Sequence, residues 1–120
     1  MWIFTKYGFF SVVEKGDQIS GPGEKDVVVR SRAKGHLGCL LAHFPDDLEG
    51  AAIEEYVGTD YPFRIRVTRQ RWQALAGRLA EEVNYDNFKD EAARWAVRRD
   101  PADEAYLDQL YEVYGVMCET

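Results

Sequence analysis

A change of hydrophobic period at Thr68 constrains the fold of this chain more than any other feature of its sequence. Before it, from Tyr61 to Thr68, apolar and polar residues alternate strictly, as a half-buried strand requires. After it, from Gln70 to Val83, apolar residues recur at every third or fourth position, which predicts an amphipathic helix with Thr68 as its N-cap. The other elements must pack around this strand–helix corner. The strand contributes Phe63, Ile65 and Val67 to the corner, and the helix contributes Trp72, Leu75, Ala76, Leu79 and Val83.

The N-terminal part of the chain predicts two strands separated by a loop. Residues Trp2–Glu14 are rich in aromatic and β-branched side chains and are apolar on both faces. This first strand is therefore either buried on both sides or bends at Gly8. Glycine and proline mark Lys15–Lys25 as a loop, and the second strand follows at Asp26–Arg32.

The rest of the chain predicts one more strand and three more helices. A short helix is expected over Ala33–Phe44, where apolar residues have helical spacing. A third strand is expected over Ala51–Val57, with a hairpin turn at residues 58–60 that leads into the fourth strand at the corner. Beyond the corner, Asp86 is a suitable N-cap for a further helix, and Asp100–Pro101 is a suitable start for the last helix.

These elements predict one α+β domain over residues 1–120. Their order is ββαββα followed by two helices, which is a ferredoxin-like βαββαβ unit with its last strand moved to the front. We therefore expect a circularly permuted ferredoxin-like sandwich with two additional C-terminal helices. Its strands would lie in the order first, second, fourth, third, with the second and fourth strands parallel. A plain α+β meander is the alternative, and the sequence leaves open whether the last helices cover the second face of the sheet.

Composition and charge narrow the class of protein. The two cysteines, Cys39 and Cys118, are too few for a disulfide framework, and the N-terminal segment does not read as a signal peptide. We therefore expect a cytoplasmic protein that does not enter a membrane and carries no cofactor. The net charge is −6, and from Glu81 onward there are eleven acidic residues against four basic ones. This balance makes nucleic acid an unexpected partner.

Three segments resemble known proteins. Met-Trp-Ile-Phe-Thr-Lys-Tyr-Gly-Phe-Phe-Ser-Val at residues 1–12 resembles the start of a group of short bacterial proteins of unassigned function. Thr-Asp-Tyr-Pro-Phe-Arg at residues 59–64 and Tyr-Asp-Asn-Phe-Lys at residues 85–89 resemble the other recurring segments of that group. The resemblance implies no activity, cofactor or partner, so the function has to be sought in the residues themselves.

The first candidate site is a group of arginines on adjacent strands. Arg30 and Arg32 share one face of the second strand, and Arg64 and Arg66 share one face of the fourth. If these faces coincide, four guanidinium groups converge, and guanidinium groups bind phosphate or carboxylate bidentately. The alternative is a solvated face whose arginines pair with acids of the third strand or of the C-terminal helices. The candidate anion site comprises Arg30, Arg32, Arg64 and Arg66, with Lys6 and Tyr7 at its rim.

Two other binding chemistries have simpler explanations. The basic and aromatic residues of Lys6–Phe10 resemble a strand motif of RNA-binding domains, but packing in a core accounts for them. His36, Cys39 and His43 lie on one side of the first helix, where they can hold zinc with Cys118 or water as a fourth ligand. A structural zinc site usually draws its ligands from two segments, so we expect no metal.

Asp60, Tyr85 and Asp86 are the candidate acid–base residues, although turn or capping roles explain both aspartates. No nucleophile elbow or phosphate loop accompanies them. We therefore expect a non-enzymatic binding or regulatory domain that recognises a partner protein or a small anionic ligand through the arginine-bearing sheet face. The alternative is a small enzyme acting on a phosphorylated or nucleotide-like substrate. A closed pocket with Asp60 or Asp86 beside the arginines would favour the enzyme.

Overall fold

The computed structural model describes residues 1–19, 25–99 and 103–119, and these form an α+β fold of five strands and four helices. The order of strands and helices confirms the ββαββα core with two additional C-terminal helices, apart from one division in the first strand. The strands are β1 (Trp2–Thr5), β2 (Gly8–Ile19), β3 (Lys25–Ser31), β4 (Glu54–Glu55) and β5 (Phe63–Val67). The helices are α1 (Lys34–His43), α2 (Arg69–Glu81), α3 (Phe88–Arg98) and α4 (Glu104–Cys118).

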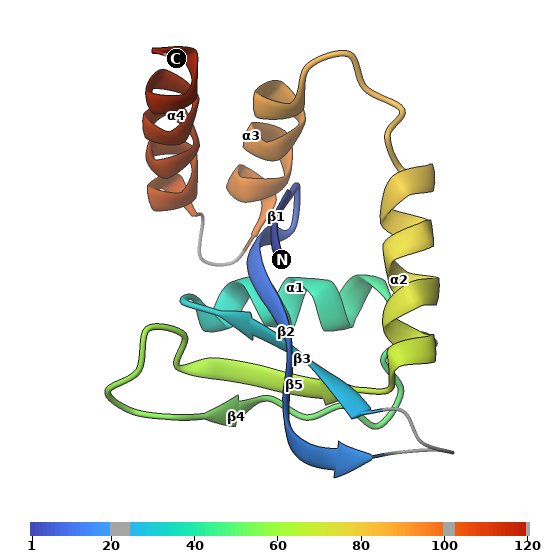
Figure 1. The fold of residues 1–120 in the computed structure, drawn as a ribbon. Coiled ribbons are helices and arrows are strands. Elements are labelled where there is room, and N and C mark those ends of the chain that lie inside the picture. The colour runs from blue at the N-terminus through green and yellow to red at the C-terminus, as the bar shows by residue number, and fades with distance from the viewer. Residues whose placement is uncertain (20–24, 100–102, 120) are drawn as a thin grey trace.

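The strands form one sheet in the order β1-β2-β3-β5-β4. Since β1 and β2 together replace the first predicted strand, the predicted order of first, second, fourth and third strand is confirmed. In Figure 1 all four helices lie above β5 and β4, which leaves the other face of these strands without a helix. The helical face carries the core side chains Val27, Val29, Ile65 and Val67.

The prediction that the second and fourth strands are parallel is wrong, because β3 and β5 pair antiparallel from Val27↔Val67 to Ser31↔Phe63. The physical reason lies in the connections. Helix α1 carries the chain back across the sheet, so β4 runs in the same direction as β3, and the turn after β4 then reverses β5. The parallel strands are thus β3 and β4, with β5 between them, as in a split βαβ unit.

The first predicted strand is a hairpin. β1 pairs antiparallel with β2 from Trp2↔Ser11 to Thr5↔Gly8, and a turn at Lys6 and Tyr7 connects them. The Thr5 hydroxyl holds the turn by accepting from the backbone N–H groups of Tyr7 (3.1 Å) and Gly8 (3.2 Å). Gly8 has φ +148°, a conformation that residues with a Cβ rarely adopt. The sequence analysis correctly singled out Gly8, but it predicted a bend within one strand. Gly8 instead follows the hairpin turn and is the first residue of β2.

The strand–helix corner forms as predicted. The Thr68 hydroxyl accepts from Arg71 N at 3.1 Å, so Thr68 is the N-cap of α2. Leu75 is fully buried and Trp72 packs against the core from a half-buried position. The helix ends at Glu81, so Val83 lies beyond it and is 62% exposed instead of completing the apolar stripe.

The last two helices begin at caps that differ from those predicted. Asn87, not Asp86, caps α3, since its side chain accepts from Asp90 N at 3.0 Å. Asp103 caps α4. The predicted start at Asp100–Pro101 lies outside the described residues. These helices bury a small second cluster, which includes Ala92, Tyr106 and Leu110 and against which Phe9 and Phe88 pack.

Strand β4 is much shorter than the predicted Ala51–Val57, because only Glu54 and Glu55 pair with β5. The connection to β5 is also longer than a tight turn at residues 58–60. It is closed by a hydrogen bond from Tyr56 N to Pro62 O (2.7 Å), and its tip includes Gly58 with φ +83°. This loop places two tyrosines beside the open face of the sheet.

Candidate functional site

Three of the predicted arginines lie together on the face of β3 and β5 that carries no helix. Arg30 is the register partner of Arg64, and Val28 is the partner of Arg66. Because residues alternate between faces along a strand, all three arginines lie opposite the core side chains Val29 and Ile65. We call this surface the arginine face; it consists of Arg30, Arg64 and Arg66 with Tyr56 and Tyr61 of the β4–β5 loop.

Each tyrosine of the arginine face holds one guanidinium group. The guanidinium carbon of Arg30 lies 4.6 Å from the ring centroid of Tyr61, and that of Arg64 lies 4.7 Å from the centroid of Tyr56. Arg30 also donates to Ser11 Oγ (2.7 Å), and Arg64 donates to the backbone oxygen of Tyr61 (3.1 Å). Planar guanidinium groups stack well on aromatic rings, so these contacts fix both arginines on the surface.

The charges of the arginine face are only partly compensated. Arg66 Nε lies 3.4 Å from Glu54 Oε1, which is the pairing with the third strand that the alternative interpretation expected. Among the described residues, Arg30, Arg32 and Arg64 have no carboxylate within ion-pair distance. Arg30 Nε is buried without a hydrogen-bond partner, and Arg32 donates to a backbone oxygen in the β4–β5 loop (2.6 Å). Three guanidinium groups thus keep their positive charge near one surface.

Lys6 and Tyr7 do not lie at the rim of the arginine face, because the hairpin reversal carries them to the helices. The Tyr7 hydroxyl donates to Glu82 Oε2 (2.6 Å), and burial, with this hydrogen bond, raises the pKa of Tyr7. Lys6 Nζ lies 3.7 Å from the same oxygen and 5.0 Å from the ring centroid of Trp95. Tyr7 and Phe10 belong to the core, so packing is the confirmed role of these two aromatics of the RNA-like segment.

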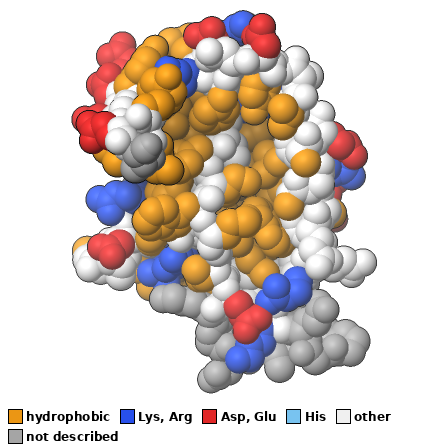
Figure 2. Space-filling model, turned by 45° about the horizontal axis from the view of Figure 1, so that its top comes forward, with side chains coloured by type: hydrophobic (Ala, Val, Ile, Leu, Met, Phe, Trp, Pro, Cys, Tyr) orange, Lys and Arg blue, Asp and Glu red, His pale blue; other side chains and the backbone are white. Residues whose placement is uncertain are grey.

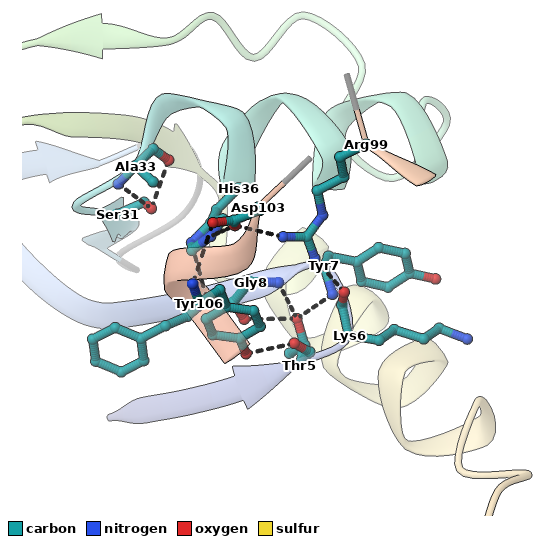
Figure 3. Close-up of polar contacts among 11 residues, drawn as sticks. Thr5, Lys6, Tyr7, Gly8, Ser31, Ala33, His36, Arg99, Asp103 and Tyr106 are labelled. Atoms are coloured by element: carbon teal, nitrogen blue, oxygen red, sulfur yellow. Dashed lines mark hydrogen bonds and ion pairs between the residues drawn. The ribbon is translucent and has the colours of Figure 1, made fainter. Parts of the chain in front are cut away.

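A buried polar cluster joins the N-terminal hairpin, α1 and the start of α4 (Figure 3). His36 Nε2 lies 2.6 Å from Asp103 Oδ2, and His36 Nδ1 accepts from Phe9 N (3.3 Å), so Nε2 carries the proton that Asp103 accepts. Burial lowers the pKa of His36, although Asp103 opposes this effect. Arg99 donates to the same Asp103 oxygen (2.8 Å) and Tyr106 OH donates to the backbone of β1 (2.6 Å). We call His36, Arg99, Asp103 and Tyr106 the polar clasp.

The three metal candidates of α1 are engaged separately. His36 uses both ring nitrogens in the polar clasp, and His43 Nε2 lies 3.1 Å from Glu82 Oε1. Cys39 is a half-buried free thiol. Within the described ranges, no group of three or more histidine, cysteine or acidic side chains is placed to hold a metal ion.

The candidate acid–base residues are far apart. Asp60 is exposed in the β4–β5 loop, whereas Tyr85 and Asp86 lie in the connection between α2 and α3. Figure 1 places these two connections at opposite ends of the molecule. The two aspartates are therefore too far apart to act together on one substrate, and Asp86 is remote from the arginine face.

A surface that the sequence analysis did not identify surrounds the edge strand β1. Between β1 and α2 lies a pocket of about 240 Å³, the α2 pocket, whose apolar lining includes Ile3, Leu79 and Val83. Between β1 and the last two helices lies a pocket of about 440 Å³, the α4 pocket, whose lining includes Phe88, Val113, Tyr114 and Met117. Phe4 lines both pockets, so the two lie side by side at β1, and we call them together the edge groove.

Large apolar side chains are exposed along the edge groove. Trp2 is 71% exposed, Met117 65% and Tyr114 55%. Figure 2 shows the resulting hydrophobic surface, which is hollowed along its middle. A signal for it was present in the sequence: from Tyr106 to Met117 the apolar residues form a stripe on α4 that is wider than packing on α3 alone requires. Exposed apolar surface of this extent typically marks an interaction site.

No helix of the described ranges has both the length and the apolar character needed to cross a membrane. Comparisons with models of protein families, with curated proteins and with solved structures found no match.

Proposed function

We propose that this protein is a non-enzymatic binding module that recognises a partner protein through the edge groove. The observation that carries the proposal is the pair of pockets with apolar linings on the two sides of β1, which share Phe4 as a lining residue. A small domain exposes such residues at a thermodynamic cost, and a partner that covers them recovers the hydrophobic free energy.

The alternative of a small enzyme has less support. An enzyme of the expected kind requires an acid or base beside the arginines. Asp86, however, lies at the edge groove, and Asp60 contacts Arg32 through its backbone oxygen. The buried ionisable groups Tyr7, His36 and Tyr106 are hydrogen-bonded to Glu82, Asp103 and the backbone of β1, respectively. These hydrogen bonds support the fold, and among the described residues these three groups do not offer a free acid–base pair.

The proposal is tested by selecting random displayed peptides on the protein and measuring their affinity for three variants. Val83→Gln and Val113→Gln each make one pocket polar, and we expect the selected peptides to bind at least about tenfold more weakly, as for loss of an interface anchor. Val57→Gln is the matched control, since Val57 is 91% exposed in the β4–β5 loop. Equal affinity for the parent and all three variants would show that the edge groove is not the binding site.

A second candidate function is the binding of a small anion or an anionic partner at the arginine face. It is favoured by Arg30, Arg32 and Arg64, which lack a carboxylate partner among the described residues. Phosphate at fixed ionic strength should raise the melting temperature of the parent, and Arg64→Ala should abolish the rise. Arg94→Ala, which alters an exposed arginine paired with Glu91, is the control. A parent unresponsive to phosphate, nucleotides and dicarboxylates would remove this candidate.

We further propose that the protein is bacterial, like the short proteins that its segments resemble, and that it works in the cytoplasm. The location is supported by Cys39 and Cys118, which are both free thiols, as is usual in a reducing compartment.

A further inference from the structure

Resting on the proposed function, we infer that the partner enters the edge groove as an extended strand that pairs with β1, and that this strand has an apolar centre with basic flanks. The inference names both the form and the charge of the bound segment. It follows from three features of the groove: the hydrogen-bonding groups along β1, the position of the two pockets, and the charge of the surrounding chain.

The backbone of β1 offers unused hydrogen-bonding groups. Within the described part of the chain, β1 is an edge strand whose one partner is β2. Met1 and Val12 exchange both backbone hydrogen bonds, at 2.7 and 2.8 Å. In an antiparallel pair such residues alternate with ones whose N–H and C=O groups point away from the partner strand. Trp2 and Phe4 are at these alternate positions, so their backbone groups point to the free edge, where another strand can pair with them.

The pockets match the side-chain pattern of an added strand. Along β1, Phe4 is on the face of Phe9, and Ile3 is on the opposite, core face with Phe10. The α4 pocket is bounded by Phe4 and the last two helices, whereas the α2 pocket is bounded by Ile3 and α2. A strand about 4.8 Å from β1 alternates its side chains between the two faces. Successive side chains would therefore enter the α4 pocket and the α2 pocket in turn, and both pockets call for apolar residues.

The charge of the chain as a whole favours a basic partner, since the groove lining itself is balanced, with Glu82 and Asp86 against Lys6 and Lys89. The α2–α3 connection and α4 belong to the part of the chain that holds eleven acidic and four basic residues. Of the two lysines at the groove, Lys6 is paired with Glu82, and Lys89 Nζ lies over the Tyr114 ring, 3.9 Å from its centroid. The exposed Asp86 has no ion pair among the described residues. A second copy of this chain, also of charge −6, would be repelled from the same surface.

The test uses a synthetic peptide with a valine- and phenylalanine-rich centre between pairs of lysines. Its matched control has the same centre between pairs of glutamates. At low salt we expect the lysine-flanked peptide to bind the full chain at least about tenfold more tightly, with an advantage that shrinks as salt is added. At saturation, hydrogen exchange of the Phe4 amide should slow by at least about tenfold, because that N–H becomes part of a strand ladder.

A pair of variants isolates the backbone contribution. Trp2→Pro removes the outward N–H, and Trp2→Ala removes the same exposed side chain but keeps the N–H. Because this N–H points away from β2, proline leaves the β1–β2 ladder intact, and an edge strand tolerates it. We expect the lysine-flanked peptide to bind Trp2→Pro more weakly than Trp2→Ala. Exchange protection in the parent chain provides the same information without a substitution.

The outcomes separate this inference from the proposed function. Suppose that Val83→Gln weakens binding of the peptide, but the bound peptide does not slow hydrogen exchange of the Phe4 amide. That result would overturn strand pairing, while the edge groove would remain the binding site. Equal affinity of the lysine-flanked and glutamate-flanked peptides would overturn the basic flanks. Binding of neither peptide, or a concentration-dependent dimer that buries β1 in sedimentation experiments without peptide, would overturn the inferred partner. The displayed-peptide selection judges the groove itself independently.

Discussion

Replacing Asp103 with alanine should lower the free energy of unfolding by about 2–4 kcal/mol, although this residue lies outside both apolar clusters. Its Oδ1 accepts from Tyr106 N (3.3 Å), and loss of an N-cap costs about 1 kcal/mol. Its Oδ2 accepts from His36, whose side chain is 8% exposed, and a buried donor left without an acceptor costs about 1–3 kcal/mol. Arg99 loses the same acceptor but still donates to the backbone oxygen of Lys6, so we add nothing for it.

Urea unfolding followed by tryptophan fluorescence and circular dichroism measures this loss. Asp103→Asn keeps one acceptor oxygen, which can serve either the helix cap or His36 but not both, so about half of the loss should return. Glu104→Ala removes an exposed acid from the same helical turn and should cost only about 0.3–1 kcal/mol through the helix dipole. If Asp103→Ala is no more destabilising than Glu104→Ala, the polar clasp does not hold α4 and the reasoning is refuted.

Three further predictions concern the core and the clasp. Gly8→Ala should lower the free energy of unfolding in urea by at least about 3 kcal/mol, since the new Cβ would lie 2.2 Å from His36 Cγ at a strained φ. Gly35→Ala, whose Cβ meets no atom within 4 Å, should cost nothing. Similar stabilities of the two variants would contradict the prediction. Burial lowers the pKa of His36 in the folded protein below its usual value of about 6.5, so neutral His36 contributes its full stability above that pH and loses it as the pH falls. The free energy of unfolding, measured between about pH 5 and 7, should therefore depend less on pH in His36→Gln than in the parent. His43→Gln should keep the pH dependence of the parent. Trp72→Ala should cost about 2–4 kcal/mol, and a loss below about 1 kcal/mol would mean that Trp72 does not support the corner.

The strand–helix corner could be predicted because its determinants are local. The change of period at Thr68 sets the end of β5 and the start of α2 within a few residues, and the cap hydroxyl is itself in the sequence. The order of the strands followed from the order of the elements. The direction of β3 relative to β5 was predicted wrongly, although the same order implies it: the helix crossover makes β4 parallel to β3, and the turn after β4 reverses β5.

The edge groove could not be predicted because it depends on a hairpin that leaves little local trace. Residues Trp2–Val13 are apolar on both faces, which fits one doubly buried strand as well as two shorter ones, and the turn lacks the usual asparagine–glycine pair. The arginine face was only half predictable for the same reason. Strand register brought Arg30 and Arg64 together, but the missed reversal removed Lys6 and Tyr7 from it.

The open edge of β1 also affects how the protein behaves when no partner covers it. An apolar strand with unpaired backbone groups is a template for self-propagating β-sheet, and natural edges are usually blunted by lysine, proline or a bulge. The four residues Trp2–Thr5 contain no charge and no proline, so protection against aggregation comes from the net charge of −6 of the whole molecule. That protection disappears near the isoelectric point of about 4.9. Acidification should therefore produce thioflavin-positive precipitate from folded protein, and a strand bound at β1 should prevent it.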